Sequence, residues 1–97
     1  MRAKLILHTK EIKGDEIVEI KIWQLSRAGD KQQNLKFSIV YIKNGMRLIG
    51  YDNAEGKGYH RHFGGHEEAY HLVTIWKLLD DFKKDLRQLR GRNWDED

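Results

Sequence analysis

Hydrophobic and polar positions alternate along the first half of the chain with a period of two, which is typical of strands buried on one face. In the clearest stretch Val18, Ile20 and Ile22 share one face, and Glu19 and Lys21 share the other. The alternation predicts four strands, over residues 3–12, 17–25, 35–42 and 46–52.

Turn signals separate these strands in pairs. Gly14-Asp15 lies between the first two, and Asn44-Gly45 lies between the third and fourth. Asn-Gly is the strongest short hairpin signal, because both residues tolerate the left-handed conformation of a type I′ turn. The polar run 26–34 predicts a loop, and residues 69–73 alternate weakly enough to be a short fifth strand or an extended connector.

The periodicity then changes to that of an amphipathic helix. Thr74 is the expected N-cap, Gly91 can end the helix, and residues 93–97 are expected to be a frayed acidic tail. The predicted apolar stripe consists of Ile75, Leu78, Leu79, Phe82, Leu86 and Leu89. The predicted polar face consists of Lys77, Asp80, Asp81, Lys83, Lys84, Asp85, Arg87 and Arg90.

These elements predict an α+β fold in one domain of residues 1–97. Its antiparallel meander of four or five strands is covered on one face by the C-terminal amphipathic helix, because each element needs a partner for its apolar face. The sheet's free edge strands could be covered by a homodimer or by a partner chain.

Composition narrows the class of protein. The 97 residues contain no cysteine, so disulfides, thiol nucleophiles and cysteine-based metal sites are excluded, and a reducing cytoplasm is expected. No apolar run is long enough to span a membrane, so no membrane association is expected. The net charge of +3 favours an acidic partner only if the basic residues gather on one face.

Residues 51–66 stand apart from the rest of the chain. They hold four of the nine glycines and three of the five histidines and show no apolar periodicity. Glycine lets the backbone approach a ligand closely, and histidine titrates near neutral pH. The pattern predicts an active or binding loop on a structural scaffold.

His60 and His62 carry the sharpest chemical hypothesis. In an extended segment both imidazoles point to one side and could flank one phosphodiester. One could take the proton of an RNA 2′-hydroxyl while the other protonates the departing 5′-oxygen. Asp52 could orient an imidazole.

Neighbouring residues could complete such a site. Lys57 and Arg61, with the amides of Gly56 and Gly58, could stabilise the phosphate, and Tyr51 or Tyr59 could stack on a base or act as an acid. Arg61 would face away from both histidines in a regular strand, so this role requires the segment to kink.

Three other interpretations stay open. A divalent metal could bind to Asp52, His60 and His62, with one coordination position left for water. The acid–base interpretation needs no cofactor. The chain could instead bind RNA or protein without catalysis, through Lys57, Arg61 and a basic helix end formed by Lys84, Arg87, Arg90 and Arg92. It could also be an inactive partner subunit.

The order of residue types in this segment resembles the TumE family of small toxins from type II toxin–antitoxin systems. The resemblance rests on Tyr51-Asp52-Asn53, Gly56-Lys57-Gly58 and His60-Arg61-His62, followed by Gly64-Gly65, Tyr70 and Leu78-Leu79-x-Asp81-Phe82. It implies a cytoplasmic toxin that acts on nucleic acid as a ribonuclease and blocks translation, and that is neutralised by a helix-turn-helix antitoxin. The motif positions that it implies are Tyr51, Asp52, Asn53, Gly56, Lys57, Gly58, His60, Arg61 and His62. The residues expected to contact substrate are Tyr51, Asn53, Gly56, Gly58 and Tyr59.

Overall fold

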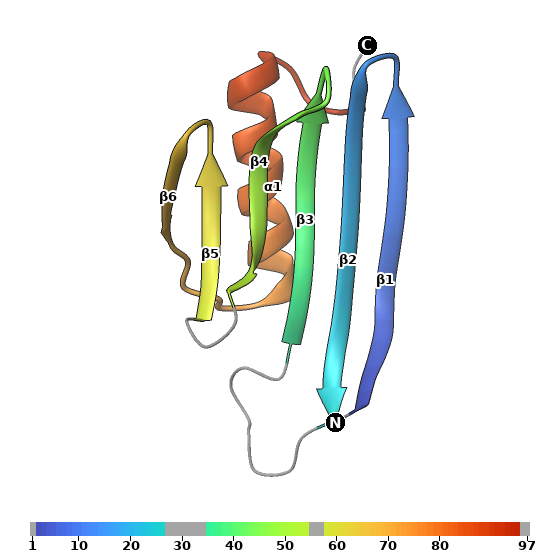
Figure 1. The fold of residues 1–97 in the computed structure, drawn as a ribbon, viewed down its shortest axis with the longest axis vertical. Helices are drawn as coiled ribbons and strands as arrows, with labels where there is room; N and C mark the ends of the chain where they lie inside the picture. The colour runs from blue at the N-terminus through green and yellow to red at the C-terminus, as the bar shows by residue number, and fades with distance from the viewer. Residues whose placement is uncertain (1, 27–34, 55–57, 96–97) are drawn as a thin grey trace.

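The described part of the chain folds into one six-stranded antiparallel sheet with a single helix packed on one face (Figure 1). The computed structural model describes residues 2–26, 35–54 and 58–95. The strands follow one another across the sheet in chain order, as a meander. Their bounds are β1 Arg2–Lys13, β2 Glu16–Ser26, β3 Leu35–Lys43, β4 Met46–Ala54, β5 Gly58–Phe63 and β6 His66–Ala69, and helix α1 is Ile75–Arg90. The predicted α+β meander is confirmed, with six strands in place of four or five.

Both predicted hairpin turns are present. Gly14 has a φ of 58°, and Asn44 and Gly45 have φ of 53° and 77°, so both central residues of the second turn are left-handed, as a type I′ turn requires. Residues 70–74 form no strand and connect β6 to α1, which confirms the connector alternative for that segment.

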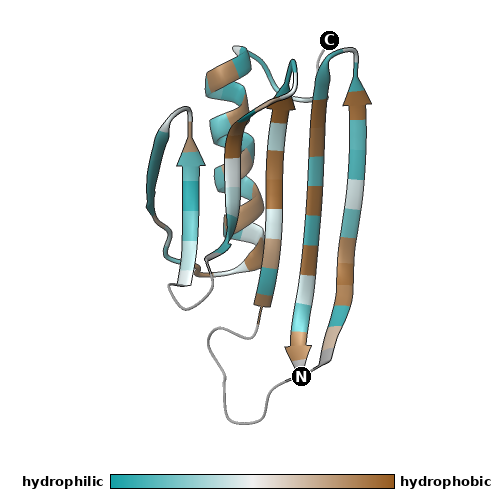
Figure 2. Ribbon diagram, viewed as in Figure 1, coloured by the Kyte–Doolittle hydropathy of each residue, from teal (hydrophilic) through white to brown (hydrophobic). Residues whose placement is uncertain are grey.

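Residues 51–66 are mostly strand, so the prediction of one long loop is wrong. β4 continues to Ala54, and β5 and β6 form a hairpin through the turn at residues 64–65. The core side of β4 and β5 carries the polar residues Asn53 and Arg61 next to the buried Tyr51 and Tyr59. These polar residues at core-side positions hid the period-two pattern. Figure 2 shows how hydrophilic β5 and β6 are compared with β2 and β3.

The core lies between α1 and the face of the sheet that α1 covers. Alternate residues of β2 to β5 point into it, together with one stripe of the helix. Its buried members are Val18, Ile22, Phe37, Ile39, Tyr41, Ile49, Tyr51, Tyr59, Leu78, Phe82 and Leu86. The opposite face of the sheet has no helix over it within the described residues, and we call it the open face.

The helix begins and ends as predicted. The Thr74 hydroxyl accepts a hydrogen bond of 3.0 Å from the Lys77 amide, which caps the first turn. Gly91 adopts a φ of 78°, and its amide donates to the Arg87 carbonyl at 2.8 Å.

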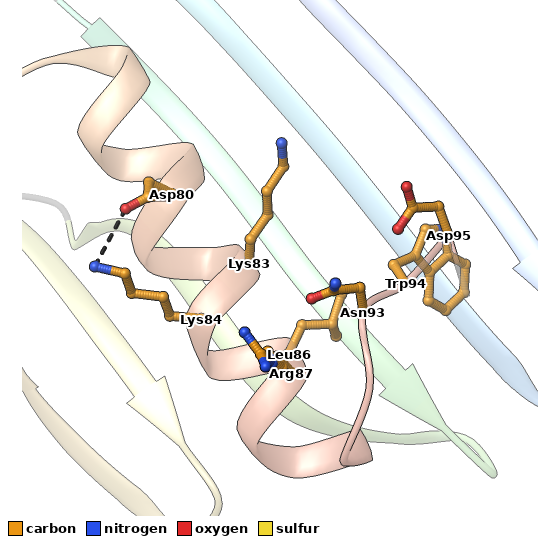
Figure 3. A pocket seen from close by; sticks show the side chains of 8 residues that line it. All are labelled: Asp80, Lys83, Lys84, Leu86, Arg87, Asn93, Trp94 and Asp95. Carbon is orange, nitrogen blue, oxygen red and sulfur yellow. Dashed lines mark ion pairs between the residues drawn. The ribbon is translucent and has the colours of Figure 1, made fainter. Parts of the chain in front are cut away.

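The segment after the helix is docked on the sheet and not frayed over its described part, residues 93–95. Trp94 packs edge-on against Tyr41 and donates from Nε1 to a Glu11 carboxylate oxygen at 3.2 Å. Residues 96 and 97 lie outside the described part. A hollow of about 580 Å³ separates this segment from α1 (Figure 3). Its lining is Asp80, Lys83, Lys84, Leu86, Arg87, Asn93, Trp94 and Asp95.

A polar contact fixes the C-terminal end of α1 to the sheet. Glu16 Oε1 accepts hydrogen bonds from Arg90 Nε at 2.8 Å and from the Tyr41 hydroxyl at 2.7 Å. The Arg90 side chain is only 4% exposed, so it does not contribute to a surface patch at the helix end. The Arg90 and Tyr41 hydrogen bonds hold the pKa of Glu16 below its usual value, while burial and the Glu16 hydrogen bond raise the pKa of Tyr41 to about 12.

This contact predicts a pH-dependent part of the stability. Because the folded pKa of Glu16 lies below its ordinary value of 4.5, its contribution is complete above pH 4.5 and is lost as the pH falls through the folded pKa. Glu16→Gln should therefore be less stable than wild type at about pH 7, and the difference should shrink at about pH 3. Urea unfolding at both pH values measures this, and a difference that does not change with pH would contradict it.

Candidate functional site

His60 and His62 lie side by side on the open face. β5 is a regular strand in which Tyr59 is buried in the core, so the two histidines between the odd-numbered residues point away from α1. Their side chains are 17% and 21% exposed. Both imidazoles therefore lie on the same side of an extended segment, as predicted from the sequence.

Both imidazoles approach one carboxylate oxygen. Glu67 Oε2 lies 3.2 Å from His60 Nδ1 and 3.8 Å from His62 Nε2. Glu67 sits opposite His62 in the β5–β6 register and is 54% exposed, on a strand of four residues at the edge of the sheet. Sequence reasoning missed this residue. The Gly64-Gly65 pair, read as a hairpin turn, would have placed it beside His62.

The His60 ring is sheltered but makes no hydrogen bond. Within the described residues neither ring nitrogen has a partner in hydrogen-bond geometry, and both atoms are shielded from solvent. Glu67 Oε2 lies 3.2 Å from Nδ1, so the two side chains form an ion pair when the imidazole is protonated.

Asp52 and Arg47 extend the cluster onto β4. Asp52 lies opposite His60 in the β4–β5 register, and its Oδ1 is 4.0 Å from His62 Nε2. Arg47 Nη1 lies 3.8 Å from Asp52 Oδ2. A Cβ built on Gly50 would meet the Arg47 side chain at 3.2 Å, so glycine leaves room for that side chain to run along β4 toward Asp52.

A match to a known family decides the identity of the chain. The family model described as toxin TumE matches residues 2–90, which include every residue of the cluster formed by Arg47, Asp52, His60, His62 and Glu67. The chain belongs to the TumE family of toxins. Comparison with curated proteins and with solved structures gave no match. Membership in TumE makes the chain a toxin and implies an antitoxin partner.

In this TumE chain the structure does not bring Arg61 together with the histidines. Because β5 does not kink, Arg61 points to the other face of the sheet, toward α1. It donates from Nε and Nη2 to the two carboxylate oxygens of Asp85 at 2.8 and 2.7 Å, and Tyr51 donates to Asp85 at 2.5 Å. The Asp85 hydrogen bonds raise the pKa of Arg61 above its ordinary value. The pKa of Tyr51 is also raised, mainly by burial and then by its hydrogen bond to Asp85.

Asn53, a TumE motif residue, and Tyr59 hold the sheet together. Asn53 accepts from the Phe37 amide at 2.8 Å and donates to the Leu35 carbonyl at 3.2 Å. Tyr59 donates to the same carbonyl at 3.0 Å and stacks on Phe37 with ring centroids 4.8 Å apart. Tyr51 is also buried on the core side of the sheet. None of these three side chains therefore lies on the open face, where a base of RNA could stack on it.

The remaining predicted site residues are glycines and a lysine. Gly58 begins β5 with a φ of 79°, and Gly56 and Lys57 lie outside the described residues. Among the described side chains, no group of three or more His, Asp or Glu is arranged to hold a metal ion. No helix in the described part of the TumE chain is long and apolar enough to cross a membrane.

Proposed function

We propose that the chain is the toxin of a type II toxin–antitoxin system and that it cleaves RNA on the open face by general acid–base catalysis. One observation carries this proposal. The imidazoles of His60 and His62 both approach a single anionic oxygen, Glu67 Oε2, at 3.2 and 3.8 Å. A phosphate oxygen of RNA in that position would lie between a general acid and a general base.

The chemistry needs one neutral and one protonated imidazole. The neutral ring accepts the proton of the 2′-hydroxyl while the 2′-oxygen forms a bond to phosphorus. As the bond from phosphorus to the 5′-oxygen breaks, the protonated ring donates its proton to that oxygen. The products are a 2′,3′-cyclic phosphate and a free 5′-hydroxyl.

The other charged residues of the cluster take supporting roles. Arg47, whose side chain is 45% exposed, supplies the cation on this face that Arg61 does not, and it would stabilise charge on the phosphate. Asp52 and Glu67 hold the imidazoles in place before RNA binds. Glu67 has to move aside, which its exposed position on the edge strand permits.

The role of Glu67 as a placeholder predicts tighter RNA binding when its charge is removed. Glu67→Gln should lower the Kd for a non-cleavable RNA oligonucleotide severalfold, because a negative charge beside the bound phosphate disappears. Glu68→Gln is the matched control, since Glu68 lies on the same strand but contacts Arg61. Weaker binding in Glu67→Gln would show that the carboxylate helps to hold the substrate.

The proposed partners follow from the same role. The antitoxin is proposed to carry a helix-turn-helix domain, and both proteins are proposed to work in the cytoplasm. A homodimer that covers a sheet edge remains part of the proposal, and the mass of the free protein in solution tests it.

Expression in a bacterial host tests the proposed function as a whole. The wild-type chain should arrest growth and leave transcripts with 2′,3′-cyclic phosphate ends, and coexpression of the antitoxin should restore growth. Growth arrest with intact transcripts would favour a toxin that binds its target without cleaving it.

A further inference from the structure

Trp23 is an aromatic side chain on the open face, where no other layer covers it within the described residues. Ile22, the residue before it on β2, is fully buried in the core. Neighbouring residues of a strand point to opposite faces, so Trp23 points to the open face. Its cross-strand neighbours are Leu5 on β1 and Lys36 on β3, and Leu5 is 50% exposed. Trp23 itself is partly exposed, and within the described residues no helix or second sheet packs over this face of β2.

Positive charge accompanies Trp23 on this face. Lys36 Nζ lies 5.4 Å from the centre of the indole ring. Lys21, two residues before Trp23 and so on the same face, is 38% exposed and lies 3.8 Å from Glu19. An aromatic ring flanked by cations is the combination with which proteins bind single-stranded nucleic acid, the ring stacking on a base and the cations contacting phosphates.

The strand registers connect Trp23 to the histidine cluster. One row of paired residues runs across the open face from Lys21 on β2 through Ser38 on β3 and Asp52 on β4 to His60 on β5. Trp23 and Lys36 form the next row on the same face. Strands are spaced about 4.8 Å apart, so Trp23 lies about 14 Å across the sheet from His60, within reach of the same strand of RNA.

We propose that Trp23, with Lys36 and Lys21, forms a subsite that stacks an unpaired base of single-stranded RNA whose scissile phosphate lies at His60 and His62. The inference rests on the proposed function, because it assumes that RNA occupies the open face. It adds a substrate class: the RNA must be single-stranded and must extend several nucleotides beyond the cleaved bond. The subsite contributes to binding and takes no part in proton transfer.

The test measures binding and cleavage separately. Binding uses an octanucleotide with 2′-O-methyl riboses, which cannot be cleaved because it lacks the 2′-hydroxyl. Trp23→Ala should raise its Kd roughly 5- to 150-fold, the range that corresponds to the loss of one stacked base. Trp23→Phe should bind nearly as wild type does, whereas Trp23→Leu, which is apolar but cannot stack, should behave like Trp23→Ala.

Two control variants separate the subsite from other surfaces. Trp76 is 80% exposed on α1, away from the open face, so Trp76→Ala should leave the Kd unchanged. Lys36→Gln should weaken binding and reduce its salt dependence, whereas Lys83→Gln beside the helix hollow should do neither. Melting temperatures of all variants check that each one folds.

Cleavage of an unmodified octanucleotide gives an independent readout. Trp23→Ala should raise KM while leaving kcat within about twofold of wild type, because the lost interaction is made equally in the ground and transition states. A dinucleotide, too short to reach Trp23, should be cleaved equally well by both proteins.

Each result decides between the subsite and the proposed function. If Trp23→Ala binds and cleaves like Trp76→Ala while His60→Ala is inactive, the subsite is wrong and the ribonuclease proposal stands. If the wild type does not bind the modified octanucleotide, the subsite is also wrong, and only the cleavage assay then tests the ribonuclease proposal. If Lys83→Gln weakens binding and Lys36→Gln does not, RNA lies on the helix side.

Discussion

Replacing His60 or His62 by alanine should lower the rate of RNA cleavage by about 10²–10⁴-fold, the usual contribution of one general acid or base. Both side chains approach Glu67 Oε2, so each is placed to exchange a proton with the same substrate. Single-turnover cleavage of a short RNA at saturating protein measures the chemical step. The pH profile of wild type should be bell-shaped, and each variant should lose one limb.

The folded state should survive these substitutions. Neither His60 nitrogen makes a hydrogen bond within the described residues, and its ion-pair partner Glu67 is 54% exposed, so His60→Ala should cost less than about 1 kcal/mol of stability. His8→Ala is the matched control. His8 is also a sheet histidine beside a carboxylate, with Nε2 2.9 Å from Glu19 Oε2, but it lies on β1 and not on β5. This variant should cleave at the wild-type rate. A His60→Ala protein with unchanged melting temperature and full activity would remove His60 from the mechanism.

Arg61→Ala should destabilise the fold by about 3 kcal/mol or more, because it leaves the carboxylate of Asp85 buried without its cation. The Asp85 side chain is 9% exposed and accepts from both Arg61 and Tyr51, so this network joins β4 and β5 to the middle of α1. Urea unfolding followed by circular dichroism measures the loss.

An exposed ion pair provides the comparison for Arg61. Lys84 and Asp80 lie 3.3 Å apart on the surface of α1, with side chains 70% and 55% exposed, and Lys84→Ala should cost less than about 1 kcal/mol. An Arg61→Ala protein as stable as Lys84→Ala would contradict the structural role. If such a stable variant were also unable to cleave RNA, Arg61 would contact substrate, as the kinked segment predicted from the sequence requires.

The scaffold was predictable because its residues obey simple local rules. β2 and β3 alternate strictly between core and open face, Asn44-Gly45 adopts the positive φ values of a type I′ turn, and Thr74 and Gly91 cap the helix. The predicted apolar stripe was wrong at Leu89, which is 38% exposed. The predicted polar face was wrong at Arg90, whose side chain is 4% exposed, and at the carboxylate of Asp85. This carboxylate is buried by a tertiary contact with Arg61, which no helical period can show.

The candidate site was only partly predictable, because cross-strand neighbours depend on register. The spacing of His60 and His62 placed both rings on one side of an extended segment, but Glu67 joins them only through the β5–β6 pairing. Arg47 depends on a bulge: pairing shifts from Tyr41–Ile49 to Ile42–Arg47, which turns Arg47 toward the open face. A single residue inserted into one strand leaves no mark in the hydrophobic pattern.

The central claim is that His60 and His62 cleave RNA by acid–base catalysis, and the ends of the product test it most directly. The purified chain is incubated with a single-stranded RNA in excess chelator, and the new ends are identified by mass spectrometry. The account predicts 2′,3′-cyclic phosphate and 5′-hydroxyl ends that are absent with His60→Ala and present with His8→Ala. Cleavage that begins only when Mg²⁺ is restored, or that gives 5′-phosphate ends, would contradict it.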